Sequence, residues 1–256
     1  MAGALAGKHA LVTGAGRGIG AAIAARLVQE GVQVTLLGRT AGVLDELARK
    51  LGTQTQVVAA DVSSAEQMRD AVQNAAAQFG PVDILVNNAG QAKSAPLHKA
   101  DDALWSSMLA VNLTGTYNGI RAVLPSMLER NFGRIVNVAS TAGLLGYPYV
   151  TAYCAAKHGV VGLTRALALE VASRNITVNA VCPGYTDTDI VRDTIRNITA
   201  KTGRSEQEAL EALVARNPQR RLIQPQEVAA TVMWLCLPGS ESITGQSIAV
   251  AGGEAM

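Results

Sequence analysis

Short apolar runs rich in β-branched residues alternate with longer segments of helical periodicity along the whole chain. The apolar runs predict seven strands, at residues 8–13, 32–38, 56–60, 84–87, 134–139, 177–182 and 247–250. The segments between them predict helices at residues 18–29, 41–51, 64–78, 102–131 (in two pieces), 152–173 and 225–237. Such repeats build parallel sheets with right-handed crossovers. We therefore expect an α/β fold, a doubly wound parallel sheet of seven strands with helices on both faces, in a single domain spanning residues 1–256.

One segment interrupts this alternation. Residues 185–217 carry no strand pattern, yet Ser205 and Glu208 have the spacing of a capping box and predict a helix start, as Ser64 and Gln67 do earlier in the chain. In an open α/β sheet the ligand lies beyond the carboxyl ends of the strands. A helical excursion leaving that edge is expected to act as a substrate lid, with a plain surface insertion as the alternative.

The composition indicates an interior built from small side chains. Hydrophobic residues make up 48% of the sequence and charged residues 16%, which excludes a disordered chain. Aromatic residues make up only 4%, so the core must consist mainly of Ala, Val, Leu and Ile. The 25 glycines agree with backbones that approach one another closely.

Charge and cysteine usage exclude several classes of function. The net charge of +2 arises without a Lys/Arg cluster, so no nucleic-acid partner is expected. The apolar stretches are shorter than the roughly 20 residues of a membrane span, and residues 1–8 lack the basic start of a secretory signal. Cys154, Cys182 and Cys236 have no disulfide or zinc spacing, which favours buried thiols in a reducing cytoplasm and no metal site.

A glycine-rich loop joins the first predicted strand to the first predicted helix. It reads Thr13-Gly14-Ala-Gly16-Arg17-Gly18-Ile19-Gly20. Glycines here permit a tight turn and let backbone N–H groups touch a pyrophosphate at the helix N-terminus, where the helix dipole favours anions. No Gly-Lys-Ser/Thr follows, which disfavours a phosphoryl-transfer loop and leaves a dinucleotide as the predicted ligand.

The end of the second predicted strand bears on the choice of cofactor. A free ribose 2′-hydroxyl usually meets an Asp or Glu at this point, about 20 residues past the loop. This chain has Gly38 and Arg39 instead. The guanidinium groups of Arg39 and Arg17 suit a 2′-phosphate, which favours NADP(H) over NAD(H). The alternative is that both arginines are solvated surface charges.

A tyrosine, a lysine and a serine form the candidate reacting centre. Tyr153 and Lys157 are four residues apart in a predicted helix and therefore lie on one face of it. A phenol ionises near pH 10 in water, and a neighbouring ammonium group lowers that pKa toward a useful range. Ser140 ends the fifth predicted strand at the ligand edge, where its hydroxyl could hold a carbonyl oxygen for the tyrosine to protonate.

Taken together, these residues resemble the short-chain dehydrogenase/reductases in their compact, Rossmann-like form. The resemblance covers essentially the whole chain. It rests on an ordered set of motifs: Thr13, Gly14, Gly18 and Gly20 in the loop, Asn87-Asn88-Ala89-Gly90, Asn112, Ser140, Tyr153, Lys157 and Pro183-Gly184.

The resemblance implies a role for each member of a catalytic tetrad. Tyr153 would be the general acid in reduction and the base in oxidation, while Ser140 would orient the substrate carbonyl. Lys157 would bind the nicotinamide ribose and lower the pKa of the tyrosine. Asn112 would hold a water in a proton relay through Lys157, with a helix-breaking or capping amide as the alternative.

The resemblance also implies the cofactor contacts. Asp61 and Val62 would lie beside the adenine, and Thr186 and Thr188 would meet the carboxamide and phosphate side unless their loop is displaced. The complete expected set is Gly14, Arg17, Gly18, Ile19, Gly20, Arg39, Asp61, Val62, Asn88, Ala89, Gly90, Tyr153, Lys157, Pro183, Gly184, Thr186 and Thr188.

The substrate is less closely defined. The region from Lys157 to Gly184 is similar to ketoreductases acting on 3-oxoacyl thioesters and polyketides, which suggests a small-molecule ketone or secondary alcohol. Leu145, Tyr147 and Tyr185, with Ser140 and Tyr153, are the candidate substrate contacts.

Assembly and rival functions follow from the same resemblance. Helices at residues 102–131 and 152–173 are apolar on more than one face, and the family implies a homodimer or homotetramer through them. An NAD(H)-dependent alcohol dehydrogenase of the family, a non-catalytic dinucleotide-binding regulator, and an epimerase or dehydratase of the longer family branch are the rivals.

Overall fold

A seven-stranded parallel sheet forms the centre of the protein. The computed structural model describes residues 3–256 and orders the strands β3-β2-β1-β4-β5-β6-β7, with every neighbouring pair parallel. The chain winds outward from β1 in both directions, which confirms the predicted doubly wound topology. The strands are β1 (His9–Thr13), β2 (Gln33–Gly38), β3 (Thr55–Ala59), β4 (Ile84–Asn87), β5 (Gly133–Val138), β6 (Ile176–Pro183) and β7 (Ser247–Val250).

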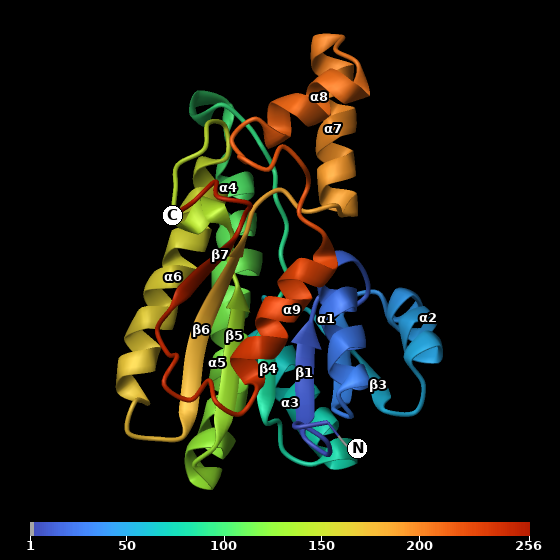
Figure 1. The fold of residues 1–256 in the computed structure, drawn as a ribbon, viewed down its shortest axis with the longest axis vertical. Coiled ribbons are helices and arrows are strands. Elements are labelled where there is room, and N and C mark those ends of the chain that lie inside the picture. The colour runs from blue at the N-terminus through green and yellow to red at the C-terminus, as the bar shows by residue number, and fades with distance from the viewer. Residues whose placement is uncertain (1–2) are drawn as a thin grey trace.

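Helices cover both faces of this sheet, as Figure 1 shows. They are α1 (Gly18–Gln29), α2 (Ala41–Leu51), α3 (Ala65–Phe79), α4 (Asp102–Leu109), α5 (Gly115–Arg130), α6 (Thr151–Glu170), α7 (Asp189–Thr202), α8 (Glu206–Val214) and α9 (Pro225–Cys236). One apolar layer joins α1, α2 and α9 to the sheet, and the opposite layer joins α3, α5 and α6 to it.

The central strands are buried on both faces, which explains their continuous apolar character. Ala10 and Val12 of β1 pack into the layer with α1 and α9, whereas Leu11 between them packs into the layer with α3 and α5. Adjacent side chains of a strand point to opposite faces, so one short run supplies both layers. Each fully buried Leu or Val contributes about 1.5–3 kcal/mol.

The predicted excursion after β6 is helical. It begins with a single parallel bridge between Thr186 and Ile223, and α7 and α8 then project beyond the carboxyl ends of the strands (Figure 1, orange). The capping box predicted at Ser205 and Glu208 is present in both directions and starts α8.

The box predicted at Ser64 forms only in part. The Ser64 hydroxyl accepts from the backbone N–H of Gln67 at 3.3 Å and starts α3. The Gln67 side chain does not return to Ser64, because its Oε1 accepts instead from the backbone N–H of Asp61 at 2.9 Å. Gln67 thus holds the chain that leaves β3, where the adenine side of the predicted site begins.

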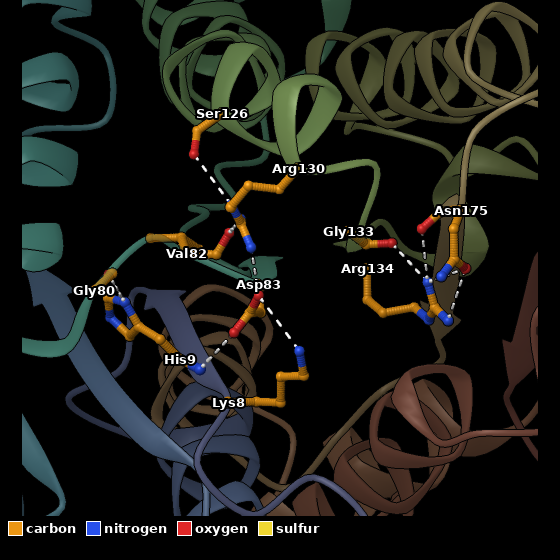
Figure 2. A network of polar contacts seen from close by, with 10 residues as sticks. All are labelled: Lys8, His9, Gly80, Val82, Asp83, Ser126, Arg130, Gly133, Arg134 and Asn175. Atoms are coloured by element: carbon orange, nitrogen blue, oxygen red, sulfur yellow. Dashed lines mark hydrogen bonds and ion pairs between the residues drawn. The ribbon is translucent and has the colours of Figure 1, made fainter.

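A polar network joins the amino ends of the strands, at the edge opposite the predicted site (Figure 2). The buried Asp83 carboxylate accepts from Arg130 at 2.7 Å and from the backbone N–H of His9 at 3.2 Å, with Lys8 3.8 Å away. Arg130 also donates to the carbonyl of Val82 at 2.7 Å. This network fixes the entrances of β1 and β4 and the end of α5.

None of the helices within residues 3–256 is both long and apolar enough to span a bilayer.

Candidate active site

The carboxyl ends of β1, β4, β5 and β6 meet at one edge of the sheet, below α7 and α8 (Figure 1). Parallel strands end on the same side, so the loops after them converge there. Gly14, Asn88, Ser140 and Gly184 each follow one of these strands directly or within two residues. The motifs that the sequence separates therefore share one edge.

The backbone of the glycine loop is packed so closely that side chains cannot be accommodated in it. Gly14 and Gly18 have φ angles of +63° and +55°, which β-carbon-bearing residues rarely adopt. A Cβ on Gly14 would lie 2.8 Å from the Cα of Ala89, and one on Gly20 would collide with the carbonyl oxygen of Gly14. Each predicted close approach thus requires glycine.

The N-terminus of α1 is free to receive an anion. Its N-cap residue, Arg17, has an extended backbone and a side chain that accepts no hydrogen bond from the helix N–H groups, and no acidic residue lies in the first turn. The first N–H groups of such a helix have no partner within it, and the helix dipole favours negative charge there. The loop and helix start therefore fit the pyrophosphate of a dinucleotide.

Thr13 and Asn88 lock this loop to the end of β4. The Thr13 hydroxyl accepts from the N–H groups of Asn88 and Ala89, each at 3.0 Å. The Asn88 amide donates to the carbonyls of Thr13 at 3.0 Å and Gly14 at 3.1 Å. Asn88 acts here through the shape of the loop. Thr13 belongs to the loop motif, but the sequence does not predict this locking role, because the hydrogen-bond partner lies 75 residues away.

The predicted adenine side lies at the ends of β2 and β3. Asp61 accepts from the Ser63 hydroxyl at 2.7 Å and its N–H at 2.9 Å, and these hydrogen bonds lower the pKa of Asp61 below its usual value. The nearby Arg39 charge lowers that pKa further. The carbonyl of Val62 accepts from the buried Asn118 amide at 2.8 Å, a contact that the sequence did not predict.

Both arginines proposed for the cofactor are exposed. Arg39 lies at the end of β2 with a solvent-facing side chain. Arg17 lies 3.6 Å from Asp189 at the start of α7; the Arg17 side chain is mostly exposed and that of Asp189 is half exposed. Exposed ion pairs contribute little energy, so Arg17 can exchange this partner for a phosphate.

Thr186 and Thr188 bring the base of the excursion to the glycine loop. Thr186 donates to the carbonyl of Gly184 at 3.0 Å, and Thr188 donates to that of Thr186 at 3.2 Å. A Cβ on Gly18 would lie 3.0 Å from the methyl group of Thr188. The chain leaving Pro183 therefore returns to the glycine loop, and contacts of Thr186 and Thr188 with a cofactor stay a prediction.

Ser140 and Tyr153 come together beside the end of β5. The Ser140 hydroxyl accepts from the N–H of Ala142 at 3.1 Å, which orients it within a short 3-10 turn. Burial raises the pKa of Tyr153 to about 12, and a hydrogen bond with Ser140 acts in the opposite direction. The phenol therefore carries its proton at neutral pH and can donate it.

Lys157 lies one turn beyond Tyr153, on the same face of α6. Its Nζ donates to the carbonyl of Val138 at 2.9 Å and lies 5.7 Å from the centre of the Tyr153 ring. Burial lowers the pKa of Lys157 to about 8. The expected lowering of the tyrosine pKa by this ammonium group is not seen in this arrangement: desolvation of the phenol raises the pKa, and the group that lowers it is Ser140.

Asn112 lies in a π-helical turn, Ala110–Thr114, between α4 and α5. It is fully buried, and its amide donates to the carbonyl of Gln91 at 2.9 Å and accepts from the Gln91 N–H at 3.2 Å. A Cβ on Gly90 would lie 2.9 Å from Asn112 Oδ1 and 3.7 Å from Lys157 Nζ. Asn112 is thus a neighbour of Lys157, and single-turn π bulges are frequent at functional sites.

Tyr147 and Tyr185 form a wall beyond Ser140. The two tyrosine rings meet edge to face, with centres 6.5 Å apart. Leu145 lines a surface hollow with Gln246, Ser247 and other residues that include none of the catalytic side chains. The Leu145 N–H donates to the carbonyl of Thr141 at 2.8 Å, and a contact of Leu145 with substrate stays a prediction.

No metal site is indicated: within residues 3–256, no group of three or more His, Cys, Asp or Glu side chains is arranged to hold an ion.

Comparisons with known proteins agree with this geometry. The family model described as short chain dehydrogenase matches residues 8–199. A candidate ketoacyl reductase of Streptomyces coelicolor is 42% identical over 95% of each chain, and the 3-oxoacyl-acyl-carrier-protein reductase of Vibrio harveyi is 39% identical over 97% of this chain and 98% of its own. A solved variant of actinorhodin polyketide ketoreductase with NADPH shares 41% identity and a TM-score of 0.92 over 99% of each chain.

The predicted resemblance is confirmed, and with it the class of reaction: an oxidoreductase that uses a nicotinamide cofactor to interconvert ketones and secondary alcohols. The chain belongs to the short-chain dehydrogenase family.

Proposed function

We propose that the protein reduces the ketone of a 3-oxoacyl thioester with NADPH. The observation that carries the proposal is the convergence of Ser140, Tyr153 and Lys157 beside a cradle shaped for a pyrophosphate. The names of the relatives support the substrate class, since two of them are ketoacyl or 3-oxoacyl reductases.

The chain's own residues supply proton transfer and orientation. The bound nicotinamide cofactor supplies the hydride in reduction and accepts it in oxidation. The Ser140 hydroxyl holds the substrate carbonyl oxygen, and the Tyr153 hydroxyl donates its proton to that oxygen as negative charge develops there. In oxidation Tyr153 takes the proton back, as microscopic reversibility requires.

Lys157 and Asn112 complete the proposed tetrad. The ammonium group of Lys157 binds the ribose hydroxyls of the cofactor and stabilises the phenolate left on Tyr153. The amide hydrogens of Asn112 donate to the carbonyls of Gln91 and Met108, so an oxygen of Asn112 holds the water that passes a proton to Lys157. The closeness of both groups to Gly90 supports this relay.

The proposed preference for NADP(H) rests on the residues at the end of β2. Gly38 supplies no carboxylate for a ribose 2′-hydroxyl, and Arg39 beside it is exposed and close enough to Asp61 to affect its pKa. A guanidinium group there suits a 2′-phosphate. The presence of NADPH in the structure of the similar polyketide ketoreductase supports the same choice.

Steady-state kinetics test the proposal. We expect reduction of acetoacetyl thioesters of coenzyme A and N-acetylcysteamine, with kcat/KM at least tenfold higher for NADPH than for NADH. A preference for NADH would favour the NAD(H)-dependent alcohol dehydrogenase instead. Absence of turnover with thioesters, cyclic ketones, steroids and sugars would favour a dinucleotide-binding regulator.

We further propose a homodimer or homotetramer in the cytoplasm. Large apolar side chains remain exposed on the helices expected to pair, including Trp105 and Tyr117 at 45% and Leu169 at 80%. Exposed apolar groups on one surface are typical of interfaces. Size-exclusion chromatography with light scattering tests this, and a monomer would refute it.

A further inference from the structure

A carboxylate from the C-terminal segment reaches the wall next to Ser140. Glu254 Oε1 lies 2.6 Å from the Tyr147 hydroxyl, which lies 2.8 Å from the hydroxyl of Thr141. A phenol has one proton, so Tyr147 donates to the carboxylate and accepts from Thr141. Glu254 thus holds, through Tyr147, the residue that follows the catalytic serine.

The turn that carries Glu254 is fixed on both sides. Gly252 and Gly253 have φ angles of +60° and +92°, and a Cβ on Gly253 would lie 3.2 Å from the ring of Pro218. A Cβ on Gly184 would lie 3.0 Å from Glu254 Oε2. The carboxylate therefore lies directly against the chain that leaves β6 on its way to Tyr185.

This carboxylate acts on the groups that surround the reacting centre. Burial raises the pKa of both Tyr147 and Tyr185, and Glu254 raises each of them further. Tyr185 in turn is close enough to raise the pKa of Tyr153. The wall made by Tyr147, Tyr185 and Glu254 is therefore within electrostatic reach of the proton donor.

Among the described residues Arg216 forms no ion pair with Glu254, although its charge lowers the pKa of Tyr185 where Glu254 raises it. The guanidinium group of Arg216 lies over the face of the Tyr147 ring, 5.1 Å from its centre, and donates to the carbonyl of Gly146 at 3.3 Å. Within residues 3–256, the only side chain hydrogen-bonded to Glu254 is Tyr147. Arg216 is exposed and screened by water, whereas Glu254 is half-buried.

We propose that Glu254 is a positioning and specificity-determining residue, which fixes Tyr147 and places a negative charge beside the substrate's acyl substituent. Tyr147 contacts Thr141, the residue after Ser140, so the wall lies next to the place where Ser140 and Tyr153 would hold a carbonyl and one of its substituents. A free carboxylate on that substituent would meet a like charge in a partly desolvated site. This inference rests on the proposed function and narrows it: the site takes neutral 3-oxo esters and thioesters and rejects free 3-oxo acids.

Matched substitutions separate the charge from the position. Glu254→Gln keeps an oxygen that can accept from Tyr147 but removes the charge, and Tyr147→Phe removes the link itself. Glu129→Gln removes the same charge from an exposed site on α5, near the opposite edge of the sheet, and is the control. Each variant is assayed with NADPH on acetoacetate and on methyl acetoacetate.

The expected result is a change in the ratio of the two substrates. Glu254→Gln should raise kcat/KM for the acid relative to the ester about tenfold, while Glu129→Gln keeps the wild-type ratio. Tyr147→Phe should raise KM for the ester more than it lowers kcat, because the wall is displaced and the proton donor is kept. The same ratio in Glu254→Gln and Glu129→Gln would overturn the charge role, and an unchanged KM in Tyr147→Phe would overturn the positioning role.

A binding measurement distinguishes failure of this inference from failure of the proposed function. Calorimetry compares 3-hydroxybutyrate with its methyl ester on the enzyme saturated with NADP+. We expect the ester to bind at least tenfold more tightly, and Glu254→Gln to reduce that difference. Equal binding would contradict the inference even if thioesters are reduced. If the ester binds more tightly than the acid but no thioester is reduced, only the proposed function is contradicted.

Discussion

Lys157 donates a hydrogen bond of 2.9 Å to the carbonyl oxygen of Val138, two residues before Ser140. This bond ties the helix that carries Tyr153 to the strand that delivers the serine. Both the ammonium group and its partner are buried, and burial lowers the pKa of Lys157 to about 8. The same burial that fixes the catalytic geometry therefore brings the lysine charge within reach of ordinary pH changes.

Activity should consequently decline on the alkaline side. As the pH rises through about 8, Lys157 loses its proton and no longer stabilises the phenolate that Tyr153 becomes. Lys157→Arg keeps a charge that does not titrate in this range. The alkaline decline in the activity of this variant should therefore move to higher pH, even if kcat falls. The measurement is kcat/KM for reduction as a function of pH. An identical alkaline limb in wild type and Lys157→Arg would assign it to another group.

The free energy of unfolding should rise over the pH range in which activity declines. The pKa of Lys157 is lower in the folded protein than the 10.5 of the free side chain, so between these values the unfolded chain binds more protons. The cost of burying the charged form is complete below about pH 8 and is relieved as the pH rises toward 10.5. Lys157→Met should therefore gain free energy of unfolding relative to wild type at pH 7, and the gain should shrink by pH 10. Urea titrations at both pH values check this, and a constant difference would exclude the linkage.

Much of this site is readable in the sequence because its signals are local. The glycine loop has its strand and helix on either side, and Tyr153 and Lys157 share a helix face through a fixed spacing. All seven strands were expected within one or two residues of their bounds, since each is a short apolar run between helical segments. Patterns of this kind depend only on neighbours along the chain.

The parts that were missed depend on distant partners. Glu254 meets Tyr147 across 107 residues, and nothing in its C-terminal surroundings marks it as part of a site. The π-helical turn at Asn112 likewise has no local signature in the sequence.

Loss of the tyrosine proton should sharply lower the rate of reduction while the fold persists. Tyr153→Phe keeps the ring and removes the donor, so kcat should fall by about 10²–10⁴, the usual contribution of general acid catalysis. Ser140→Ala should also lower kcat, because the carbonyl loses a hydrogen bond that orients it. Binding of NADPH, followed by fluorescence, should remain. Near-intact turnover in Tyr153→Phe would show that the assigned mechanism is wrong.

The choice between cofactors should depend on Arg39 more than on Arg17. The nearby acid, Asp61, is already hydrogen-bonded to Ser63, which leaves the guanidinium group of Arg39 available for a 2′-phosphate. Arg39→Ala should therefore lower kcat/KM for NADPH about tenfold and leave kcat/KM for NADH little changed. Arg17 has the alternative partner Asp189 at 3.6 Å, which reduces its availability. Kinetics with both cofactors measure the effect. Equal losses with NADPH and NADH would place Arg39 outside the 2′-phosphate site.

The Asp83 carboxylate, at the amino ends of the strands, should affect stability and not catalysis. Asp83 is buried, pairs with Arg130 at 2.7 Å and accepts from the N–H of His9, so Asp83→Asn leaves a half-buried guanidinium group without its counter-charge. Breaking such a pair costs about 3 kcal/mol, less where water reaches the arginine. Urea unfolding of the purified variant should show a midpoint shift with an unchanged m-value. Below the transition, kcat should match that of wild type, because the network lies at the amino ends of β1 and β4 (Figure 2) and the reacting groups lie at the other edge. A variant with normal stability and altered kcat would contradict this separation of the two edges.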